Sequence, residues 1–429
     1  VLRGNTQEVE ILTLEDCLRI GIDNNLSLEG KRKEIQKSKY GVSENRSKLL
    51  PQINAIAGYS NNFDPPVSVT DGSSYGVPYN ITQTLQHSAN AGLEMQMPLF
   101  NQTLYTSMSI AKVMEEISRL SYGKAREDVI LQISKMYYLG QVTAEQIMLI
   151  KANITRLEEL RDITQAFFDN GMSMEVDLKR VNINLENLKV QYDNAQAMMK
   201  QQLNMLKYIM DYPAEKEIAL TPVNTDSITT VALTGLSENI YELQLSQSQV
   251  QLAERQKKII TNGYIPSLSL TGSWRYAAYT DKGYHWFHSG PSNQWFRSYG
   301  VGLTLRIPIF DGLDKTYKIK KAMIDIENKR LAWEDARKNL QTQYLNAVND
   351  LMNNQRNFKK QKDNYLLAED VYAVTSDRYR EGIASMTEVL QDEMQMSEAQ
   401  NNYISAHYNY RVTNLMLLKL TGQIESLVK

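Results

Sequence analysis

The sequence predicts an α+β membrane protein made of two similar halves, each a helix, a β-hairpin and a pair of long helices. Three observations predict this fold class: the positions of the prolines, a sustained seven-residue repeat, and four segments in which apolar residues alternate with small or polar ones. The first separates helical from non-helical windows. The second indicates helices packed as coiled coils, and the third indicates strands able to cross a bilayer.

Composition excludes several classes of protein. The 429 residues include 47 basic and 49 acidic side chains, so the net charge of -2 argues against a nucleic-acid partner, which requires a basic surface. A single cysteine, Cys17, excludes a disulfide framework and any multi-cysteine metal site. No apolar run approaches the roughly 20 residues of a transmembrane helix.

Long helices are predicted wherever proline is absent. All ten prolines lie outside two windows, Leu99–Tyr212 and residues 309–429, which also hold few glycines. These windows predict helices over about residues 101–170 and 173–210, and over about 313–381 and 384–420. Glycine is expected at the turn between the helices of each pair, because a left-handed residue is needed there.

The second window also carries a heptad seam. Its members step by four and three residues and are mostly apolar or aromatic, although Asn, Gln and Thr interrupt them, which indicates coiled-coil packing. The seam positions are Leu340, Tyr344, Ala347, Leu351, Asn354, Phe358, Gln361, Tyr365, Ala368, Tyr372, Thr375 and Tyr379.

Between the prolines of each half the period changes to two. Strands are predicted over about residues 52–62 and 88–98 in the first half and about 267–279 and 299–308 in the second, each close to bilayer length. The segments between them, 61–88 and 280–298, are expected to be exposed loops, with Tyr79, Trp286 and Trp295 as interfacial aromatics. Half-buried strands of a soluble sheet would show the same alternation, so this alternative stays open.

The halves correspond position by position. Pro51 answers to Pro266, Pro98 to Pro308, and Gly171 to Gly382, at offsets of 215, 210 and 211 residues. A repeat of this length indicates two equivalent halves of one body rather than a solenoid. We therefore place the first repeat at residues 1–210, a linker at 211–235, the second repeat at 236–420 and a tail at 421–429.

Four strands cannot close a membrane barrel by themselves. The smallest such barrels have about eight strands, and an open edge in lipid leaves backbone groups unpaired. The chain is therefore expected to oligomerise. Two copies would give eight strands with a filled interior, whereas three would give twelve with room for water and solutes.

The ordered set of motifs resembles the TolC-type outer-membrane factors, the exit ducts of Gram-negative efflux pumps and type I secretion systems. The resemblance covers essentially the whole chain. It is carried by the two proline brackets, the two glycine turns and the stretches Tyr379–Gly382, Thr387–Leu390 and Ala399–Tyr403, with counterparts at Asn170-Gly171, Asp177-Leu178 and Tyr192–Ala195. It implies a homotrimer whose twelve-stranded β-barrel lies in outer-membrane lipid and continues as a long α-helical coiled-coil tunnel in the periplasm.

The resemblance also implies the partners. Residues 211–235 and 421–429 would form an equatorial belt around the tunnel. A periplasmic adaptor protein would dock at the turn end, and an inner-membrane transporter of the RND or ABC type would supply both substrate and energy. No cofactor is expected, and the sequence contains no G-x-x-x-x-G-K-[ST] nucleotide loop.

The same resemblance assigns the candidate site residues. Glu388 takes the place of the acidic residue that rings the periplasmic aperture nearest the tip, and Gln391 stands at the next acidic position of the family. Tyr379 matches a tyrosine that hydrogen-bonds the first-half acidic position, Asp177, in the closed state. The family's latch arginine aligns with Ala384, so that link is missing or replaced, with Arg378 and Arg380 as the alternatives. The turn residues assigned to adaptor contact are Asn170, Gly171, Met172, Glu381, Gly382 and Ile383.

Each assignment has a structural alternative. Glu388 would equally suit a solvated helix face, and Tyr379 completes the heptad seam. His285 and His288 lie three residues apart near Asp281, but a third well-spaced metal ligand is missing. Cys17 is expected in a short helix capped by Thr13 and Asp16, and to be buried rather than reactive.

Three other functions compete with a duct. An enzyme is disfavoured because the sequence contains no H-E-x-x-H or G-x-S-x-G motif. A soluble coiled-coil scaffold would explain the heptads but not the alternating strands or the proline brackets. A periplasmic adaptor protein would have one helical hairpin with flanking lipoyl and barrel domains, whereas this chain shows two hairpins and no such flanks.

Overall fold

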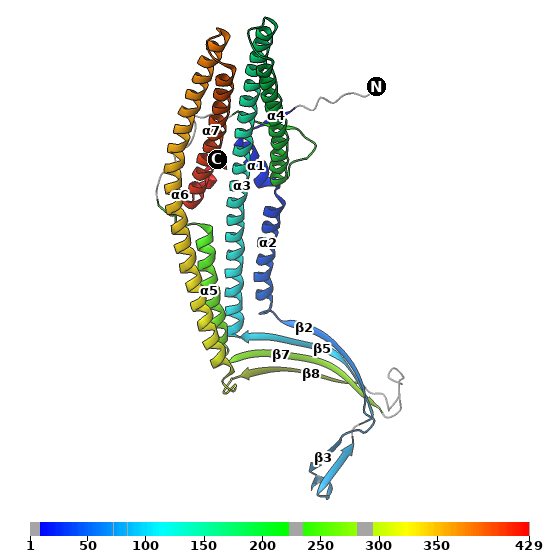
Figure 1. The fold of residues 1–429 in the computed structure, drawn as a ribbon. Helices are drawn as coiled ribbons and strands as arrows, with labels where there is room; N and C mark the ends of the chain where they lie inside the picture. Colours follow the sequence, from blue (N-terminus) through cyan, green and yellow to red (C-terminus); the bar gives the residue numbers. More distant parts are fainter. Residues whose placement is uncertain (1–8, 72, 84, 223–234, 281–294, 429) are drawn as a thin grey trace, which may run out of the picture. The chain divides into compact units, whose positions relative to one another are not determined.

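The computed structural model describes residues 9–71, 73–83, 85–222, 235–280 and 295–428 (Figure 1). The chain divides into two compact units, one formed by residues 1–35, 118–247 and 331–429 and the other by residues 36–117 and 248–330. We call them the helical unit and the strand unit. Trp286, Asp281, His285, His288 and part of the predicted 211–235 linker lie outside the described residues.

Seven α-helices are described, and the two longest have 68 and 67 residues. At about 1.5 Å per residue each of these two spans roughly 100 Å. None of the helices in the described ranges is both long and apolar enough to pass through a bilayer. The helices are α1 (Leu14–Asn24), α2 (Leu26–Ser47), α3 (Gln102–Asp169), α4 (Glu175–Met210), α5 (Tyr241–Asn262), α6 (Asp314–Arg380) and α7 (Met386–Leu420), with short 3-10 helices η1 (Ser73–Tyr75) and η2 (Ile424–Val428).

The predicted heptad seam of α6 is confirmed. All twelve seam positions are buried or half-buried, while most of their neighbours on α6 are exposed. The seam faces α7 and α3 within the helical unit: the ring of Phe358 stacks on that of Tyr403 at 5.8 Å, and Asn354 Nδ2 donates to Thr413 Oγ1 at 2.8 Å. Polar residues of the seam, such as Asn354, can therefore form hydrogen bonds across the helix contact, as buried polar groups in a coiled coil require.

Four long strands form one antiparallel sheet in the strand unit (Figure 1). They pair in the order β2–β5–β7–β8, so β2 and β8 are the edges and have no strand on their outer sides among the described residues. The bounds are β2 Gln52–Asn61, β5 His87–Phe100, β7 Ser267–Thr280 and β8 Trp295–Arg306.

Pro98 does not end its strand, contrary to the predicted boundary. β5 continues to Phe100, with a register shift against β7 between Pro98 and Phe100. Beyond Gln96, which pairs with Gln52 at the start of β2, this part of β5 has a neighbour on one side only. Proline is tolerated at sheet edges and at bulges, and both conditions hold here.

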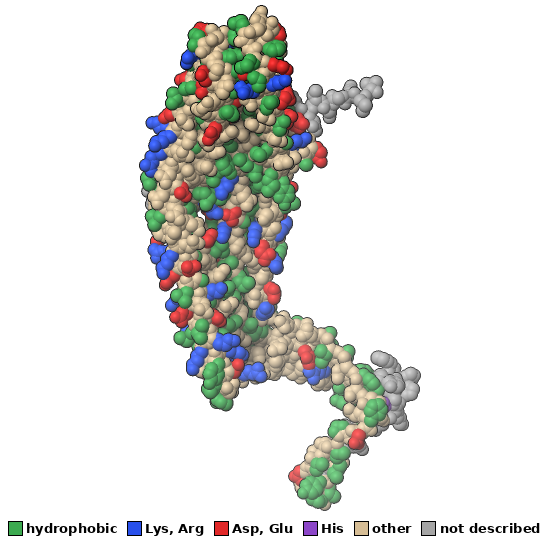
Figure 2. All heavy atoms as spheres, viewed as in Figure 1, with side chains coloured by type: hydrophobic (Ala, Val, Ile, Leu, Met, Phe, Trp, Pro, Cys, Tyr) green, Lys and Arg blue, Asp and Glu red, His purple; other side chains and the backbone are tan. Residues whose placement is uncertain are grey.

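The predicted loop over residues 61–88 is wrong in its middle, where a second hairpin forms. β3 (Val67–Asp71) pairs antiparallel with β4 (Tyr79–Gln83), with Val69 opposite Ile81. Alternating Val, Thr and Ile residues favour short strands, and Gly76, with a φ of +73°, makes the turn between them. Hydrophobic side chains cover much of this hairpin's visible surface (Figure 2).

The described residues nearest the N-terminus pack into the helical unit. β1 (Glu10–Leu12) pairs in parallel with β6 (Ile218–Leu220), two three-residue strands that periodicity did not reveal. The predicted capping box of α1 is confirmed: Thr13 Oγ1 accepts from the Asp16 backbone N–H at 3.1 Å and Asp16 accepts in return. Cys17 is fully buried, and burial raises the pKa of its thiol to about 12, so it is unreactive.

Charged residues gather around Glu127 on α3, at the level where α3 meets the end of α7. Lys419 Nζ lies 2.5 Å from Asp128 Oδ1, and Arg126 Nη1 lies 2.7 Å from Glu425 Oε1. Glu127 itself is 4% exposed, and burial raises the pKa of its carboxyl to about 7, with the Lys419 charge opposing the rise. Glu127 is thus a buried carboxyl that is costly to ionise.

Glu127→Gln is expected to change the pH dependence of stability. Between about pH 4.5 and 7 the folded chain holds a proton on Glu127 that the unfolded chain has lost, so stability falls as the pH rises through this window. The cost is at most about 3 kcal/mol per chain above pH 7. The thermal unfolding midpoint in detergent should therefore rise in Glu127→Gln at pH 8 and change little at pH 4. Glu116→Gln, an exposed change on the same helix, should leave both midpoints unaltered; equal gains at both pH values would contradict the assignment.

Candidate functional site: the helix turns and the gate residues

The two helical hairpins turn through the same backbone motif. Gly171 and Gly382 both have a left-handed backbone, with φ of +72° and +77°. In the first turn Met172 N–H donates to Phe167 O at 2.7 Å and Gly171 N–H to Phe168 O at 2.9 Å. In the second turn the corresponding bonds, from Ile383 and Gly382, are 2.8 and 2.9 Å long. Both are Schellman motifs, in which a residue with a Cβ atom would be strained at the glycine position.

The helices that leave these turns begin differently. Ser385 caps α7: its Oγ accepts from the Glu388 backbone N–H at 3.3 Å, and the Glu388 carboxylate accepts from the Ser385 backbone N–H at 3.3 Å. The N-cap residue of α4 is Met174, which makes no side-chain capping bond. The reciprocal capping box fixes the orientation of Glu388 at the start of α7.

The predicted gate residues of α7 lie at the protein surface. Glu388 and Gln391 are both exposed and, three residues apart, occupy neighbouring positions on one face of the helix. Glu393 is buried instead, and burial raises the pKa of its carboxyl against the opposing charge of Arg156. Of these side chains, Glu388 and Gln391 are the ones placed to meet solvent or another chain.

Tyr379 is a core residue in this structure. Its hydroxyl lies 3.2 Å from Thr164 Oγ1, and because Thr164 donates its own proton to Leu160 O at 2.7 Å, Tyr379 is the donor of the pair. Its ring lies 5.7 Å from that of Phe167. The bond to Asp177 implied by the family resemblance is absent from the hydrogen bonds of the described residues. The heptad position of Tyr379 directs it toward α3 rather than α4.

Asp177 is held by an arginine that the sequence analysis did not single out. Arg180 Nη1 lies 3.4 Å from Asp177 Oδ1 and also donates to Thr387 Oγ1, at 3.4 Å. This chain of contacts joins the first turn of α4 to the first turn of α7, and so joins the two halves close to their glycine turns. Ala384 is buried, whereas Arg380 is turned toward Glu159 at 3.3 Å.

A buried apolar cluster, which we call the tip core, supports these turns. It draws side chains from α3, α4, α6 and α7, so all four helices share it. Arg156 lies beside it: its Nη1 donates to Glu369 Oε1 at 3.3 Å, and its guanidinium lies 6.0 Å from the Tyr372 ring centroid. The tip core comprises Leu157, Leu160, Val181, Leu185, Leu188, Tyr372, Tyr379, Ala384, Met386, Val389, Leu390 and Met396.

A second buried polar network lies farther from the turns. Arg411 Nε donates to His407 Nε2 at 2.9 Å, which places the imidazole proton on Nδ1, 3.3 Å from Glu145 Oε2. Burial opposes ionisation of Glu145, but hydrogen bonds from His407 and Tyr403 outweigh it and lower the pKa of its carboxyl. His407 is thus a satisfied structural histidine. The described residues contain no group of three His, Cys, Asp or Glu arranged to hold a metal ion.

Apolar side chains are exposed at the turns themselves. Met172 and Ile383 occupy the position after each turn glycine, where a Schellman motif usually packs an apolar residue against its own helix. Here both are exposed, as are Met174 and Val176 at the start of α4. The turns therefore present an apolar surface rather than a purely polar one.

Comparison with known proteins identifies the family. The sequence profile of the outer membrane efflux protein family matches residues 20–210 and 232–423. The chain is 21% identical over 399 residues to the outer membrane protein TolC of Vibrio cholerae, covering 89% of this chain and 84% of that one. It is 23% identical over 379 residues to the probable efflux pump outer membrane protein TtgC of Pseudomonas putida, covering 83% and 75%.

Solved structures show the same fold. The structure of CusC, described in terms of transmembrane channel formation, superimposes with a TM-score of 0.79 over 98% of this chain and 95% of that chain, at 15% identity. That of VceC from Vibrio cholerae gives a TM-score of 0.75 over 95% and 96%, at 14% identity. The resemblance inferred from the motifs is thereby confirmed, and the chain belongs to the outer membrane efflux protein family.

Proposed function

We propose that the protein is the outer-membrane exit duct of a tripartite efflux pump or a type I secretion system. It acts as a homotrimer with a twelve-stranded barrel and a helical tunnel. Substrates pass through it passively from an inner-membrane transporter of the RND or ABC type and a periplasmic adaptor protein. Membership of the outer membrane efflux protein family places it in the outer membrane of a Gram-negative bacterium.

The β-sheet carries this proposal. Every residue of β8 is exposed in the single chain, including Tyr299, Val301, Leu303 and Leu305 on one face. An apolar face of this size requires a cover, and lipid supplies it in an outer membrane. The opposite face is polar, with the Arg275 guanidinium paired to the Glu94 carboxylate, as suits a water-filled lumen.

The free edges of the sheet support a trimer. β2 and β8 each lack a partner on one side among the described strands, and unpaired backbone groups in lipid cost several kcal/mol each. Pairing β8 of one chain with β2 of the next seals every edge when the ring closes. Three chains give twelve strands and an open interior.

Two exposed apolar stripes in the helical unit support the same assembly. On α4, Val176, Ile183 and Val190 recur every seven residues. On α6, exposed apolar residues beside the buried seam recur at intervals of seven or fourteen residues and form a second stripe. Because the stripes differ, α6 of one chain can pack against α4 of the next, a heterologous contact that closes into a ring. The α6 stripe consists of Leu331, Leu345, Met352 and Leu366.

The turn region supports a gate and an adaptor site. In a trimer, three copies of the exposed Glu388 and Gln391 would surround one axis, and an acidic ring favours cations. The Asp177–Arg180–Thr387 contacts would take the place of the arginine latch missing at Ala384, while Tyr379 would anchor α6 to the tip core. The exposed Met172 and Ile383, with Asn170, Gly171, Glu381 and Gly382, would form the adaptor-contact surface.

Planar-bilayer recording tests the proposal. Purified protein should insert from detergent and give stepwise ionic currents without nucleotide, and chemical cross-linking should give trimers. A coiled-coil scaffold would remain soluble without detergent and pass no current. A stable monomer in detergent-free buffer would overturn the proposal.

A further inference from the structure

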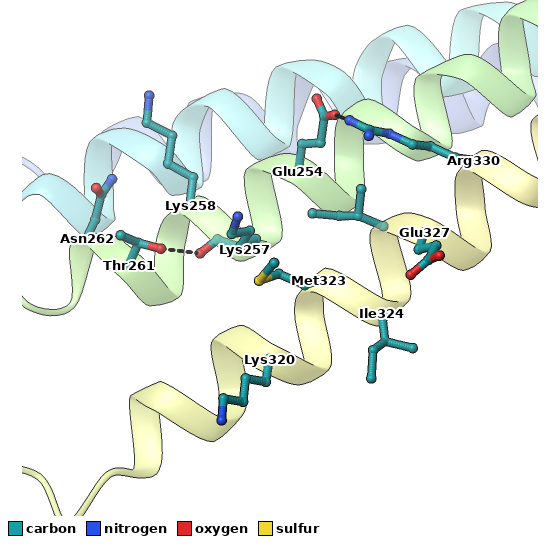
Figure 3. Close-up of a pocket in the computed structure, with 11 residues that line it drawn as sticks. Glu254, Lys257, Lys258, Thr261, Asn262, Lys320, Met323, Ile324, Glu327 and Arg330 are labelled. Atoms are coloured by element: carbon teal, nitrogen blue, oxygen red, sulfur yellow. Dashed lines mark hydrogen bonds and ion pairs between the residues drawn. The ribbon is translucent and has the colours of Figure 1, made fainter.

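A groove between α5 and α6 in the strand unit is not used by the proposed duct. It has a cavity volume of about 1050 Å³ and lies between the last turns of α5 and the first turns of α6 (Figure 3). Lys257 and Lys258 of α5 line it together with Lys320, Met323 and Ile324 of α6. The groove thus combines a basic and an apolar lining.

The lysines of this groove lack acidic partners. Within the described ranges, Lys257, Lys258 and Lys320 form no ion pair with a carboxylate, whereas Arg330 at the far end is paired to Glu254 at 2.8 Å (Figure 3). Glu327 is the remaining acidic side chain of the lining. The end of the groove nearest the strands is therefore positively charged, with three lysines that a ligand could neutralise.

The position of the groove matches the level of lipid headgroups. α5 ends at Asn262 and β7 begins at Ser267, and Ile265 between them is exposed. On the other strand, β8 is followed by Ile309 and Phe310, which are 93% and 80% exposed. In the proposed duct these apolar residues would lie at the boundary of the hydrocarbon region. The lysines follow within a few helical turns, which would place them at the level of the lipid phosphate groups.

The apolar lining indicates which face is turned to lipid. On the other side of the same helix pair, a smaller groove is lined by four polar or charged residues, Lys318, Lys321, Asp325 and Gln256, together with Ile260 and two alanines. That lining suits a watery lumen. Met323 and Ile324 lie on the opposite side of α6 and are exposed, so their groove suits the outer surface.

We propose that the α5–α6 groove binds an anionic phospholipid of the leaflet that faces the periplasm. Its anionic headgroup is attracted by the lysines at the basic end of the groove, and the start of an acyl chain lies on Met323 and Ile324. The inference rests on the proposed function, because it requires strands β7 and β8 to cross the outer membrane.

Lipid binding by the intact protein in detergent tests this. Native mass spectrometry should show more bound phosphatidylglycerol than phosphatidylcholine. Lys257→Gln/Lys320→Gln should weaken phosphatidylglycerol binding about tenfold, because the change removes two positive charges that attract the anionic headgroup. The control is Lys318→Gln/Lys321→Gln, which removes two lysines at the same level from the other side of the helix pair, one of them, Lys318, paired to Asp314 at 2.7 Å. It should bind as the unchanged protein does.

Site-directed labelling examines the groove itself. Cys17 is buried, so a maleimide on Met323→Cys reports the groove alone. Labelling should proceed in lipid-free trimers and be blocked by phosphatidylglycerol. Three results would overturn the lipid site. The first is an equal loss of phosphatidylglycerol binding in both double variants, and the second is displacement of the bound lipid by inorganic phosphate alone. The third is a failure of the maleimide to label Met323→Cys in lipid-free trimers, which would mean that a neighbouring chain covers the groove. Bilayer currents measured on the same samples test the proposed duct separately. Currents without lipid binding would exclude the lipid site alone, whereas the absence of currents would count against the duct itself.

Discussion

Ile183→Asp on α4 and Leu345→Asp on α6 are each expected to convert the trimer to monomers. Both side chains belong to the exposed apolar stripes of the helical unit, where the proposed trimer would bury them against a neighbouring chain. A buried, unpaired carboxylate costs several kcal/mol, and the symmetry of a ring repeats that cost three times. Size-exclusion chromatography with light scattering in detergent should show loss of most of the trimer.

The adjacent exposed residues provide matched controls. Asn182→Asp and Asn346→Asp add the same charge one position along the same helices, about 100° away from the stripes. Both should remain trimeric. If the stripe variants stay trimeric as well, α4 and α6 do not meet between chains, and the tunnel must assemble through other faces.

Glu388→Gln is expected to abolish most of the cation preference of the channel. Gln keeps the size of the side chain and its oxygen acceptor for the Ser385 backbone N–H, so it removes charge while preserving the helix cap. In a trimer the change removes three negative charges from one ring. The ratio of cation to anion permeability, measured from reversal potentials in a salt gradient, should fall severalfold toward unity.

Ser385→Ala separates the gate from the cap. This change removes the hydroxyl that accepts from Glu388 N–H, at a cost of about 1 kcal/mol to the start of α7, but leaves the carboxylate in place. It should lower thermal stability slightly and retain the cation preference. A cation preference unchanged in Glu388→Gln would mean that the glutamate only caps its helix.

Periodicity predicted the long helices and their seam because many residues contribute to each signal. The twelve seam positions of α6 agree with one another, and an error at any one of them would not alter the result. Short elements lack this redundancy. The three-residue strands β1 and β6 are stabilised by their mutual pairing across about 200 residues, which no local pattern encodes.

The side-chain partners at the turns were harder to predict for a different reason. Each residue along a helix rotates the side-chain direction by about 100°, so Glu393, two residues after Gln391, points to the opposite side and is buried while Gln391 is exposed. Tyr379 contacts Thr164, 215 positions away, because α3 rather than α4 lies against the seam of α6. Arg180 carried no motif, and its role emerges only where α4 approaches α7.

The unequal starts of α4 and α7 have a mechanical consequence for the two hairpins. α7 starts with a capping box between Ser385 and Glu388, whereas α4 starts after Met174 without a side-chain capping bond. Unwinding the opening turn of α4 therefore costs about 1 kcal/mol less than unwinding that of α7. Under a force applied at the two turns, the first turn of α4 would unwind before that of α7, and the second hairpin would keep its conformation.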